Sequence, residues 1–595
     1  MQGPNNQGQA VQQRSRGPAL DFEPAAHRPQ LTAALSAIAA EAARTAERPL
    51  PKPVMDAILR RHPRAGRGFF SRSELIAGFP AFSSECSLRE DELVACVQMR
   101  PVRTQSGVTP VTVLTKPYPC PGKCVFCPND VRMPKSYLSD EPGCQRAESN
   151  DFDPYRQTYS RLLAFRAIGH PTDKAELIVL GGTFSFYPQA YRIWFIKRCF
   201  DAMNDFGAGR DGRELVPRLA LSDDALDGRA LGAGYNRVVT RWLARTDASG
   251  ESATLAELRS SQLQNERAGT RNVGLALETR PDHVDEAEVL LLRELGCTKV
   301  QLGFQSLDDE ILRVNQRGHD VVATRRAVDL LRRAGFKLLA HVMPNLLGAT
   351  PEGDVRDFAR VFDDPDFRPD ELKVYPCSLI ESAELMLHYE RGDYRPYDRD
   401  QLAHVLREAL AKTPRYCRLV RMIRDISSGD IVAGNKLSNF REIAERELHE
   451  RGGKAQDIRS REIRGAAVGG EGELRTTEYE TSCGRERFIE FATEGDRLLG
   501  FCRLTLPRAE SFVAELSRSA LLREVHVYGA SLGLGMRDAA RAQHRGLGTK
   551  LIEEACRQAK LEGYTALAVI SAVGTREYYR RRDFTDGDLY QHRQL

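Results

Sequence analysis

Long apolar runs are missing from this 595-residue chain, and none approaches the roughly 18 residues that a membrane-spanning helix needs. The N-terminus is rich in Gln, Gly, Asn and Pro and lacks the apolar stretch of a signal peptide. The cysteine count, 13, is odd, and without a secretory signal these thiols are expected to stay reduced. We therefore expect a globular, cytoplasmic protein that has no contact with a membrane.

An excess of one charge is also missing, because 86 Lys and Arg face 82 Asp and Glu for a net charge of +4. Any nucleic-acid surface must then come from local clustering. One basic cluster, RRHPRAGR, is followed by Phe69 and Phe70, so guanidinium groups could contact phosphates while the rings stack on unpaired bases. The alternative is a solvated basic loop beside two core phenylalanines. The candidate nucleic-acid residues are Arg60, Arg61, Arg64, Arg67, Arg100 and Arg103.

A second pair of metal ligands is missing around the most specific motif, KPYPCPGKCVFCPN. It holds Cys120, Cys124 and Cys127 in the spacing C-x3-C-x2-C, whereas a structural zinc site normally has four ligands. Thiolates bind iron–sulfur clusters as well as zinc. Three thiolates on a four-iron cluster leave one iron open, where a small molecule can bind and react. The alternative is zinc with a remote fourth ligand such as Cys144.

The central part of the chain alternates short apolar runs with longer helical stretches such as 286–295 and 323–334. This alternation predicts a parallel sheet covered by helices, as in a partial barrel. The six expected strands are 111–114, 177–180, 273–277, 300–304, 338–342 and 372–375.

Glycine and polar residues lie at the carboxyl ends of these strands, where barrel folds carry out their chemistry. Gly181 and Gly182 would let the backbone approach a ligand closely, although an ordinary turn also uses glycine. Glu278 could bind a ribose hydroxyl or a positive ligand group, or it could simply cap a helix or pair with Arg280. The same set includes Gln305, His341 and Lys373.

The C-terminal part contains a strand, LREVHVY, and then the sequence QHRGLG before a predicted helix over 549–562. Free N–H groups and the dipole at the start of such a helix suit a pyrophosphate. A strand over 566–571 follows, and then Tyr578 and Tyr579. Either tyrosine could protonate a thiolate leaving group, although core packing is the alternative.

These patterns divide the chain into five regions. The polar insertion 206–272 interrupts the third of them and contains one expected helix over 243–263. The five are a disordered tail over 1–25, a basic helical region over 26–105, the barrel domain over 106–398, a basic helical linker over 399–465 and a second domain over 466–595.

The cysteine motif followed by GGTF resembles the radical S-adenosylmethionine (SAM) superfamily, and the QHRGLG region resembles the GNAT acetyltransferases. Together with LETRPD, QRGH, HVMPNL, DIRSREI and GTREYYRRRDF, they resemble the family of Elongator catalytic subunits from about residue 102 onwards. The resemblance implies an α/β fold: a partial (β/α)6 radical SAM barrel, a C-terminal α+β GNAT domain and a helical, tRNA-binding N-terminal region.

The same resemblance implies a tRNA uridine(34) acetyltransferase that uses a 4Fe-4S cluster, SAM and an electron donor. A radical formed from SAM would take a hydrogen atom from the methyl group of acetyl-CoA. The resulting carbon would add to carbon 5 of the wobble uridine and remain there as a carboxymethyl group. Whether the protein forms a homodimer stays open. The residues implied to bind the cofactor SAM are Gly181, Gly182, Glu278 and Gln305.

On the acetyl-CoA side, the resemblance implies a lysine before the second strand and near acetyl-CoA, which Lys174 matches. The candidate catalytic residues are Lys174, Glu524, Tyr578 and Tyr579. The other residues implied to bind acetyl-CoA are Val525, His526, Val527, Gln543, Gly546, Leu547, Gly548 and Thr549.

Three other functions are compatible with parts of this pattern. A protein lysine acetyltransferase with a structural iron–sulfur domain would use Glu524 as its base. A scaffold could bind tRNA and only sense acetyl-CoA, and a radical SAM enzyme could act on a small molecule. The intact cysteines and the GGTF sequence argue against the first, and the basic cluster argues against the last.

Overall fold

The computed structural model describes residues 22–64, 68–99, 104, 106–215, 234–246, 248–437, 439–463, 472–528 and 546–595. Four predicted site residues lie outside these ranges: Arg67, Arg100, Arg103 and Gln543. The chain divides into two compact units, Met1–Pro101 with Leu162–Pro171, and Val102–Arg161 with Thr172–Leu595. Within the described ranges, no helix is long and apolar enough to cross a membrane.

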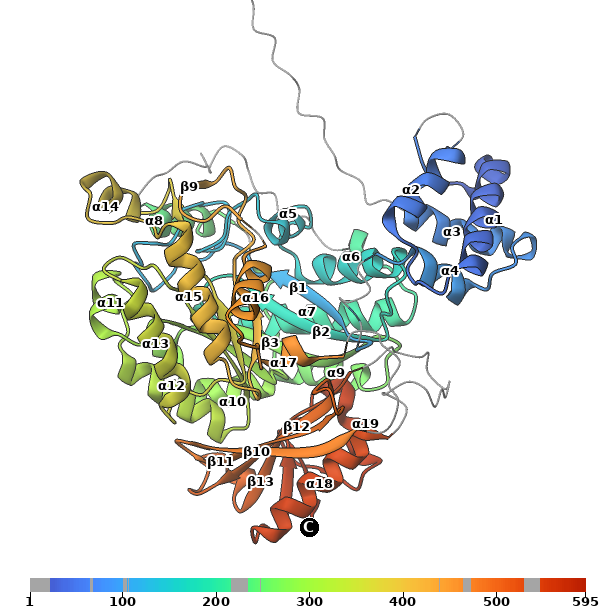
Figure 1. The fold of residues 1–595 in the computed structure, drawn as a ribbon. Helices are drawn as coiled ribbons and strands as arrows, with labels where there is room; N and C mark the ends of the chain where they lie inside the picture. Colours follow the sequence, from blue (N-terminus) through green and yellow to red (C-terminus); the bar gives the residue numbers. More distant parts are fainter. Residues whose placement is uncertain are drawn as a thin grey trace, which may run out of the picture. The chain divides into compact units, whose positions relative to one another are not determined.

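The first unit is helical, as its sequence periodicity predicts, and is drawn in blue in Figure 1. Leu31, Leu35 and Ile38 recur at helical spacing and are fully buried, so one apolar stripe forms the core. Ser71 and Glu74 form a reciprocal capping box that fixes the start of the third helix. The elements are η1 (Pro24–His27), α1 (Arg28–Arg44), α2 (Lys52–Arg61), α3 (Arg72–Phe82), η2 (Ser83–Glu85) and α4 (Glu90–Val97).

The second unit begins with a sheet of seven parallel strands in the order β1-β2-β3-β4-β5-β6-β8. Its first six strands coincide with the six predicted ones, so the partial barrel is confirmed. Strands such as β4 are buried on both faces, as expected in a parallel sheet covered by helices. The strands are β1 (Thr109–Leu114), β2 (Lys174–Leu180), β3 (Arg271–Thr279), β4 (Lys299–Gln305), β5 (Lys337–Val342), β6 (Glu371–Val374) and β8 (Arg418–Arg421).

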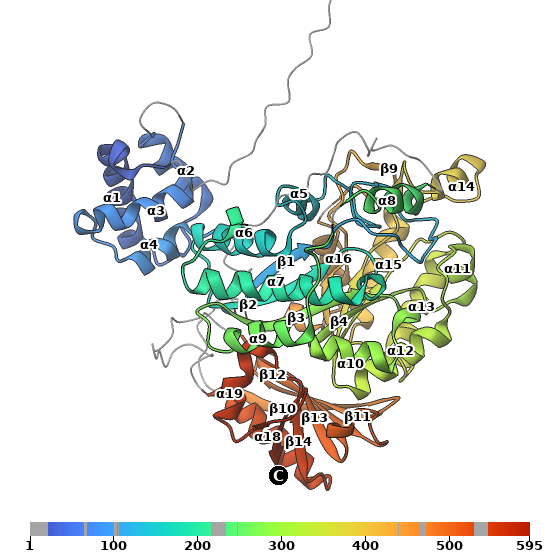
Figure 2. The same cartoon turned by 180° about the vertical axis from the view of Figure 1, so that it is seen from behind.

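Helices cover the outer face of this sheet, and Figures 1 and 2 show them from opposite sides. Helices lie between each pair of consecutive parallel strands, which is the usual strand–helix–strand crossover, and α16 and α17 follow the last strand, β8. The helices are α5 (Pro142–Glu148), α6 (Pro154–Ala167), α7 (Gln189–Gly207), α10 (Glu286–Glu294), α11 (Asp309–Val314), α12 (Val321–Arg333), α13 (Pro351–Asp363), α14 (Leu385–Arg391), α15 (Arg399–Lys412), α16 (Phe440–Glu450) and α17 (Ile458–Arg461).

The predicted helical linker over 399–465 needs a correction. It contributes β8 to the barrel sheet, and its β9 (Ile431–Ala433) pairs with β7 (Leu379–Ile380). This stretch has no strand pattern in the sequence, because Leu419 and Val420 are the only apolar residues of β8. Its basic residues are also engaged within the protein, since Arg415 pairs with Glu490 at 2.6 Å.

The described residues of the insertion 206–272 form two α-helices after α7, where one was expected. α8 (Tyr235–Leu243) ends where the predicted helix begins, and α9 (Leu255–Asn265) packs on α7. Gly250 lies between the two helices, and glycine costs about 1 kcal/mol in a helix interior, so a break there is favourable.

The C-terminal domain is a mixed sheet in the order β10-β11-β12-β13-β14-β16-β15, with α18 packed on it. Only β13 and β14 run parallel, because α18 connects them as a crossover helix. The predicted strands over 522–528 and 566–571 and the helix over 549–562 are all present. The elements are β10 (Glu473–Thr481), β11 (Gly484–Ala492), β12 (Leu498–Pro507), β13 (Ser519–Val527), α18 (Leu547–Leu561), β14 (Ala566–Val569), α19 (Arg576–Arg580), β15 (Thr585–Asp586) and β16 (Gln591–Gln594).

A buried ion network joins this domain to the barrel. The Arg523 guanidinium donates to both carboxylate oxygens of Asp370, at 2.6 and 2.8 Å, and to Glu486 at 2.7 Å. All three side chains are fully buried. Arg332 of α12 lies 3.4 Å from Glu486, so both domains supply charges of both signs. Removing any one member of this network should be strongly destabilising, because the remaining charge would be buried without a partner.

Candidate active site at the two ends of the barrel

The cysteine motif forms a loop that leaves the carboxyl end of β1. Cys124 and Cys127 are buried and Cys120 is half-buried, so the loop is an ordered part of the fold. Asn236 of α8 fixes its first cysteine, because its side chain accepts from the Cys120 N–H at 2.9 Å and donates to the Cys120 carbonyl at 2.8 Å. Glu251, also from the insertion, pairs with Lys116. The insertion therefore positions the cysteine loop, and its lack of any recognisable motif hid this role from the sequence.

The thiols of this loop are electrostatically unequal. A hydrogen bond with Cys127, reinforced by the nearby charge of Arg317, holds the pKa of the Cys124 thiol well below its ordinary value. The same hydrogen bond, together with burial, raises the pKa of Cys127. Arg317 Nη1 lies 3.5 Å from the Cys124 sulfur. The positive surroundings favour the thiolate form that metal binding requires.

The zinc alternative has little support in this geometry. Cys144 packs in a separate apolar cluster with Leu114, Met133 and Phe152. In the part of the chain that the structure describes, no three His, Cys, Asp or Glu side chains lie close enough together to hold one metal ion. Thiolates that bind different irons of one cluster do not need to meet that condition.

Buried polar atoms without partners surround the cysteine loop. Among the described residues, no hydrogen-bond partner is found for Arg280 Nη1, Gln305 Oε1, Arg317 Nε or either ring nitrogen of His319. A buried polar atom left unpaired costs about 1–3 kcal/mol, so such a concentration indicates a ligand. Two guanidinium groups suit the negative charge of a thiolate-bound cluster, and the Gln305 oxygen suits a donor group of SAM. The residues present therefore fit a 4Fe-4S cluster and SAM.

Backbone geometry at the neighbouring strand ends agrees with this assignment. Gly181 has φ +125°, and a Cβ there would overlap the Thr115 hydroxyl, so no other residue fits. Gly182 also has a positive φ, +74°. Gln305 adopts φ +67°, an uncommon value for a residue with a side chain, and such strain is typical of ligand sites.

Glu278 lies at the carboxyl end of β3 and faces the barrel interior. It accepts a hydrogen bond from the Tyr137 hydroxyl at 3.2 Å, and His341 Nδ1 lies 3.7 Å away. Burial raises the pKa of Glu278, although the charge of Lys373 opposes the shift. The helix-capping alternative is therefore not what the structure shows at this position.

A cavity of about 790 Å³ lies at the other end of the barrel, between the amino ends of its strands and the C-terminal domain. It brings together almost all the predicted acetyl-CoA residues. Leu547 is the exception, because its side chain is buried in the domain core. The predicted residues that line the cavity are Lys174, Glu524, Val525, His526, Val527, Gly546, Gly548, Thr549, Tyr578 and Tyr579.

The start of α18 is shaped for a phosphate-bearing ligand. Gly546 caps the helix in the left-handed region at φ +72°. A Cβ on Gly548 would lie 2.6 Å from the Tyr578 hydroxyl, so glycine keeps the helix start open at this side. Arg582, which the sequence analysis missed, adds a positive charge here and donates to the Thr549 hydroxyl at 2.9 Å. Arg582 lies in the segment GTREYYRRRDF, but only the tertiary structure places it beside the helix.

Tyr578 is better placed than Tyr579 to act on a ligand. Its side chain is 37% exposed and stacks under Arg582, whose guanidinium carbon lies 3.6 Å from the ring centroid. Burial raises the pKa of Tyr578, so its hydroxyl stays protonated and can donate. Tyr579 is 7% exposed and packs on Phe584, which agrees with the core-packing alternative for this residue.

Glu524 lines the cavity but is already engaged by two cations. Lys337 lies 2.5 Å from one carboxylate oxygen and Arg503 lies 2.8 Å from the other. Burial raises its pKa, yet these two charges outweigh burial and leave the pKa below its ordinary value. A carboxylate held in this way is a poor general base, so its geometry suits positioning of Lys337 better.

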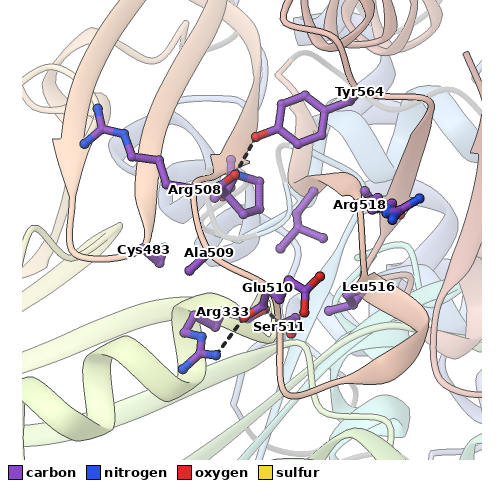
Figure 3. Close-up of a pocket in the computed structure, with 13 residues that line it drawn as sticks. Arg333, Cys483, Arg508, Ala509, Glu510, Ser511, Leu516, Arg518 and Tyr564 are labelled. Carbon is purple, nitrogen blue, oxygen red and sulfur yellow. Dashed lines mark hydrogen bonds between the residues drawn. The ribbon is translucent and has the colours of Figure 1, made fainter.

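A second, smaller pocket of about 160 Å³ lies between α12 and the loop after β12 (Figure 3). Arg333 and Arg508 border it, and in Figure 3 the Arg508 side chain extends away from the other lining residues. Arg333 donates to the Glu510 carbonyl at 2.8 Å, and Arg508 pairs with Glu480 at 2.7 Å. It contains none of the predicted site residues.

In the helical first unit, the predicted RNA-binding residues differ from one another. Arg60 and Arg61 end α2 and are exposed, whereas Arg64 pairs with Glu74 at 2.6 Å. Phe69 is 56% exposed and free to stack, whereas Phe70 is 2% exposed and belongs to the core. Phe70 therefore fits the core-packing alternative, and stacking of Phe69 on RNA bases stays a prediction.

Comparisons with known proteins identify the family of the chain. The Radical SAM superfamily model matches residues 245–360, and the Radical_SAM C-terminal domain model matches residues 369–450. A tRNA uridine(34) acetyltransferase of Dehalococcoides mccartyi is 38% identical over 80% of this chain and 95% of the relative. The chain belongs to the tRNA uridine(34) acetyltransferase and Elongator complex protein 3 family.

Other members support the same assignment. Elongator complex protein 3 of Danio rerio is 34% identical over 83% of this chain and 85% of the relative. The solved structure of an N-terminally truncated Elp3 from Methanocaldococcus infernus has a TM-score of 0.65 at 33% identity, covering 82% of this chain and 100% of that one. Membership of the radical SAM superfamily implies the use of SAM and a 4Fe-4S cluster.

Proposed function

We propose that the protein is a tRNA uridine(34) acetyltransferase, an acyltransferase that adds a carboxymethyl group, derived from acetyl-CoA, to carbon 5 of the wobble uridine. The observation that carries this proposal is the position of the two sites on one barrel. The cysteine loop and its unpartnered polar atoms occupy the carboxyl end, and the cavity with the acetyl-CoA candidates reaches the amino end. The names of the relatives support the same function.

When bound, a 4Fe-4S cluster held by Cys120, Cys124 and Cys127 would, with SAM and an electron donor, supply the radical chemistry that joins the acetyl methyl carbon to carbon 5 of the uridine. SAM would leave as methionine and 5′-deoxyadenosine, the proton of carbon 5 would be released, and the electron would return to the cluster. Water cleaves the thioester and releases CoA, so one acetyl-CoA gives one carboxymethyl group.

The chain's own residues bind, orient and transfer protons in this scheme. The N–H groups at the start of α18 and the Arg582 guanidinium bind the pyrophosphate of CoA. The Tyr578 hydroxyl donates to the leaving thiolate. Lys174, at the amino end of β2, lies in the same cavity and positions the acyl end. The buried arginines beside the cysteines balance the negative charge of the cluster.

The tRNA has to present a uridine that is not paired or stacked, because RNA recognition of this kind targets splayed-out loop bases. The exposed Arg60, Arg61 and Phe69 of the helical first unit offer phosphate contacts and a stacking surface for such RNA.

The protein lysine acetyltransferase alternative needs a general base near the acetyl carbonyl. Glu524 was the candidate, but its contacts with Lys337 and Arg503 keep it ionised and engaged. The unpartnered polar atoms around the cysteine loop would also have no purpose in a purely structural domain. Both observations favour the tRNA reaction.

The test is an anaerobic reaction with reconstituted cluster, SAM, dithionite, acetyl-CoA and unmodified tRNA, followed by mass analysis of the nucleosides. We expect carboxymethyluridine only when all components are present. Acetylated lysine on a histone-type peptide, formed without SAM or dithionite and without any modified uridine, would overturn the proposal in favour of the acetyltransferase alternative.

A further inference from the structure

The charges that line the cavity at the amino end of the barrel are almost all paired with one another. Lys299 pairs with Glu176 at 2.5 Å and with Glu371 at 3.3 Å, and Lys337 pairs with Glu371 at 2.9 Å. Among the described cations that line the cavity, three have no carboxylate oxygen within 4 Å: Lys174, Lys373 and Arg582. Arg582 lies beside α18, at the phosphate end, so Lys174 and Lys373 remain for the acyl end.

Lys373 is held in the barrel interior by a neutral partner. It belongs to β6, and its ammonium group donates to Gln301 Oε1 at 2.6 Å. Gln301 lies on β4, which is separated from β6 by β5 in the sheet. It is 2% exposed, and its Oε1 also lies 3.2 Å from His341 Nε2. Burial lowers the pKa of His341 well below its ordinary value, so that ring is neutral. The Glu278 carboxylate interacts with Lys373 only through its charge, at more than hydrogen-bond distance. It lies next to His341, with 3.7 Å between Glu278 Oε1 and His341 Nδ1.

An ammonium group with a neutral amide as its partner keeps its charge available for a ligand. The charge of a paired ammonium such as Lys299 is already neutralised by two carboxylates. Inside a cavity of low dielectric constant, a charge of this kind is strongest as a donor to an oxygen that gains negative charge during a reaction. The thioester carbonyl of an acyl-CoA is such an oxygen, since attack by water makes it an oxyanion.

We propose that Lys373 binds the carbonyl oxygen of the acetyl group, with Gln301 as the positioning residue that holds its ammonium in place. The ligand's identity as acetyl-CoA rests on the proposed function, whereas the carbonyl contact applies to any short acyl-CoA. The contact places the acyl group in the barrel interior, beside Gln301 of β4. Lys373 thereby both orients the acyl group and stabilises the oxyanion formed on thioester cleavage.

The test compares two unreactive ligands on the full chain, without cluster, SAM or tRNA. One is the ketone analogue of acetyl-CoA, in which methylene replaces the thioester sulfur, and the other is the same molecule with its carbonyl reduced to methylene. We expect the wild type to bind the ketone about tenfold more tightly, as for one charge-assisted hydrogen bond. Lys373→Met should bring this ratio close to one, and Lys373→Arg should restore part of it.

Two further variants make the result specific. Gln301→Glu places a carboxylate beside the intact Lys373, so it should also bring the ratio close to one although the lysine is present. Lys436→Met, at an exposed lysine outside the cavity, should leave the ratio unchanged. The proposal is overturned if Lys373→Met or Gln301→Glu keeps the tenfold ratio. It is also overturned if these variants lose as much affinity for CoA itself as for the ketone analogue. Because the assay needs no turnover, a failure to form carboxymethyluridine would be a separate result.

Discussion

The two ends of the barrel differ in what lies beside their buried charges. At the carboxyl end, Arg280 pairs with Asp282 and Arg317 lies against the Cys124 sulfur, and each guanidinium keeps one buried N–H group without a partner among the described residues. At the amino end, Asp370 and Arg523 pair with each other, although Arg332 and Arg503 beside them also keep one buried N–H group each. Unpaired groups beside thiols can be completed by a ligand, whereas a paired network stabilises an interface. The comparison sets the end that we propose binds a charged cofactor against the end that holds two domains together.

The cavity between the barrel and the C-terminal domain contains both paired and unpaired charges. Most of its charges belong to the paired interface, but Lys174, Lys373 and Arg582 do not. Such an arrangement lets one surface serve both as a rigid contact and as a ligand site. The following predictions test whether the division between unpaired and paired charge also divides chemistry from stability.

The largest effect is expected from Cys124→Ser. Loss of one thiolate of three should reduce iron binding from about four atoms per chain to a small fraction of that and remove nucleoside modification entirely. Iron analysis and mass analysis of the tRNA check both results. Cys86→Ser, at a half-buried cysteine of the first unit, is the control and should behave like the wild type. Full iron content in Cys124→Ser would show that this loop does not hold the cluster.

The paired end should respond in stability. Asp370→Ala leaves the fully buried Arg523 short of its main partner, and we expect a loss of about 3–5 kcal/mol in the free energy of unfolding of the C-terminal region. Thermal unfolding and limited proteolysis measure it. Asp400→Asn, at an exposed position of α15, should change stability by about 0.5 kcal/mol or less. Equal stability of the two variants would contradict the role assigned to the network.

Tyr578→Phe tests the chemistry within the cavity. Removing the hydroxyl removes the proposed donor to the thiolate, so turnover should fall about 100-fold while acetyl-CoA affinity changes little. Tyr579→Phe, in the neighbouring core ring, is the matched control and should lose much less. Nucleoside yield per minute and acetyl-CoA titration separate the two effects. The assignment to Tyr578 fails if Tyr579→Phe is the more damaging change.

The smallest effect is expected in the helical first unit. Arg60→Ala with Arg61→Ala should weaken tRNA binding several-fold and lower the slope of log affinity against log salt by about 0.7 for each lost phosphate contact. Arg64→Ala should change the slope less, because Arg64 already pairs with Glu74. Titrations at several salt concentrations give these slopes. Unchanged slopes in the double variant would place the tRNA elsewhere.

Sequence reasoning was most successful where a local pattern is tied to a backbone requirement. Gly181 and Gly182 were expected beside a ligand, and both adopt positive φ at the end of β2. The six barrel strands followed from apolar runs separated by helices. β8 was missed because a strand with two apolar residues has no detectable period. The functions of Asn236 and Arg582 were missed because hydrogen bonds between distant segments leave no spacing in the sequence.

The sequence by itself determined the chemistry that depends on residues close together in the chain: the three thiolates, the glycine-rich start of α18 and the order of strands and helices. Only the tertiary structure decided which charges are paired. Arg415 belongs to a basic stretch of sequence yet pairs with Glu490, while Lys373 has no carboxylate within 4 Å among the described residues. The physical reason is that pairing depends on distances between segments far apart in the chain, which folding sets and local sequence does not.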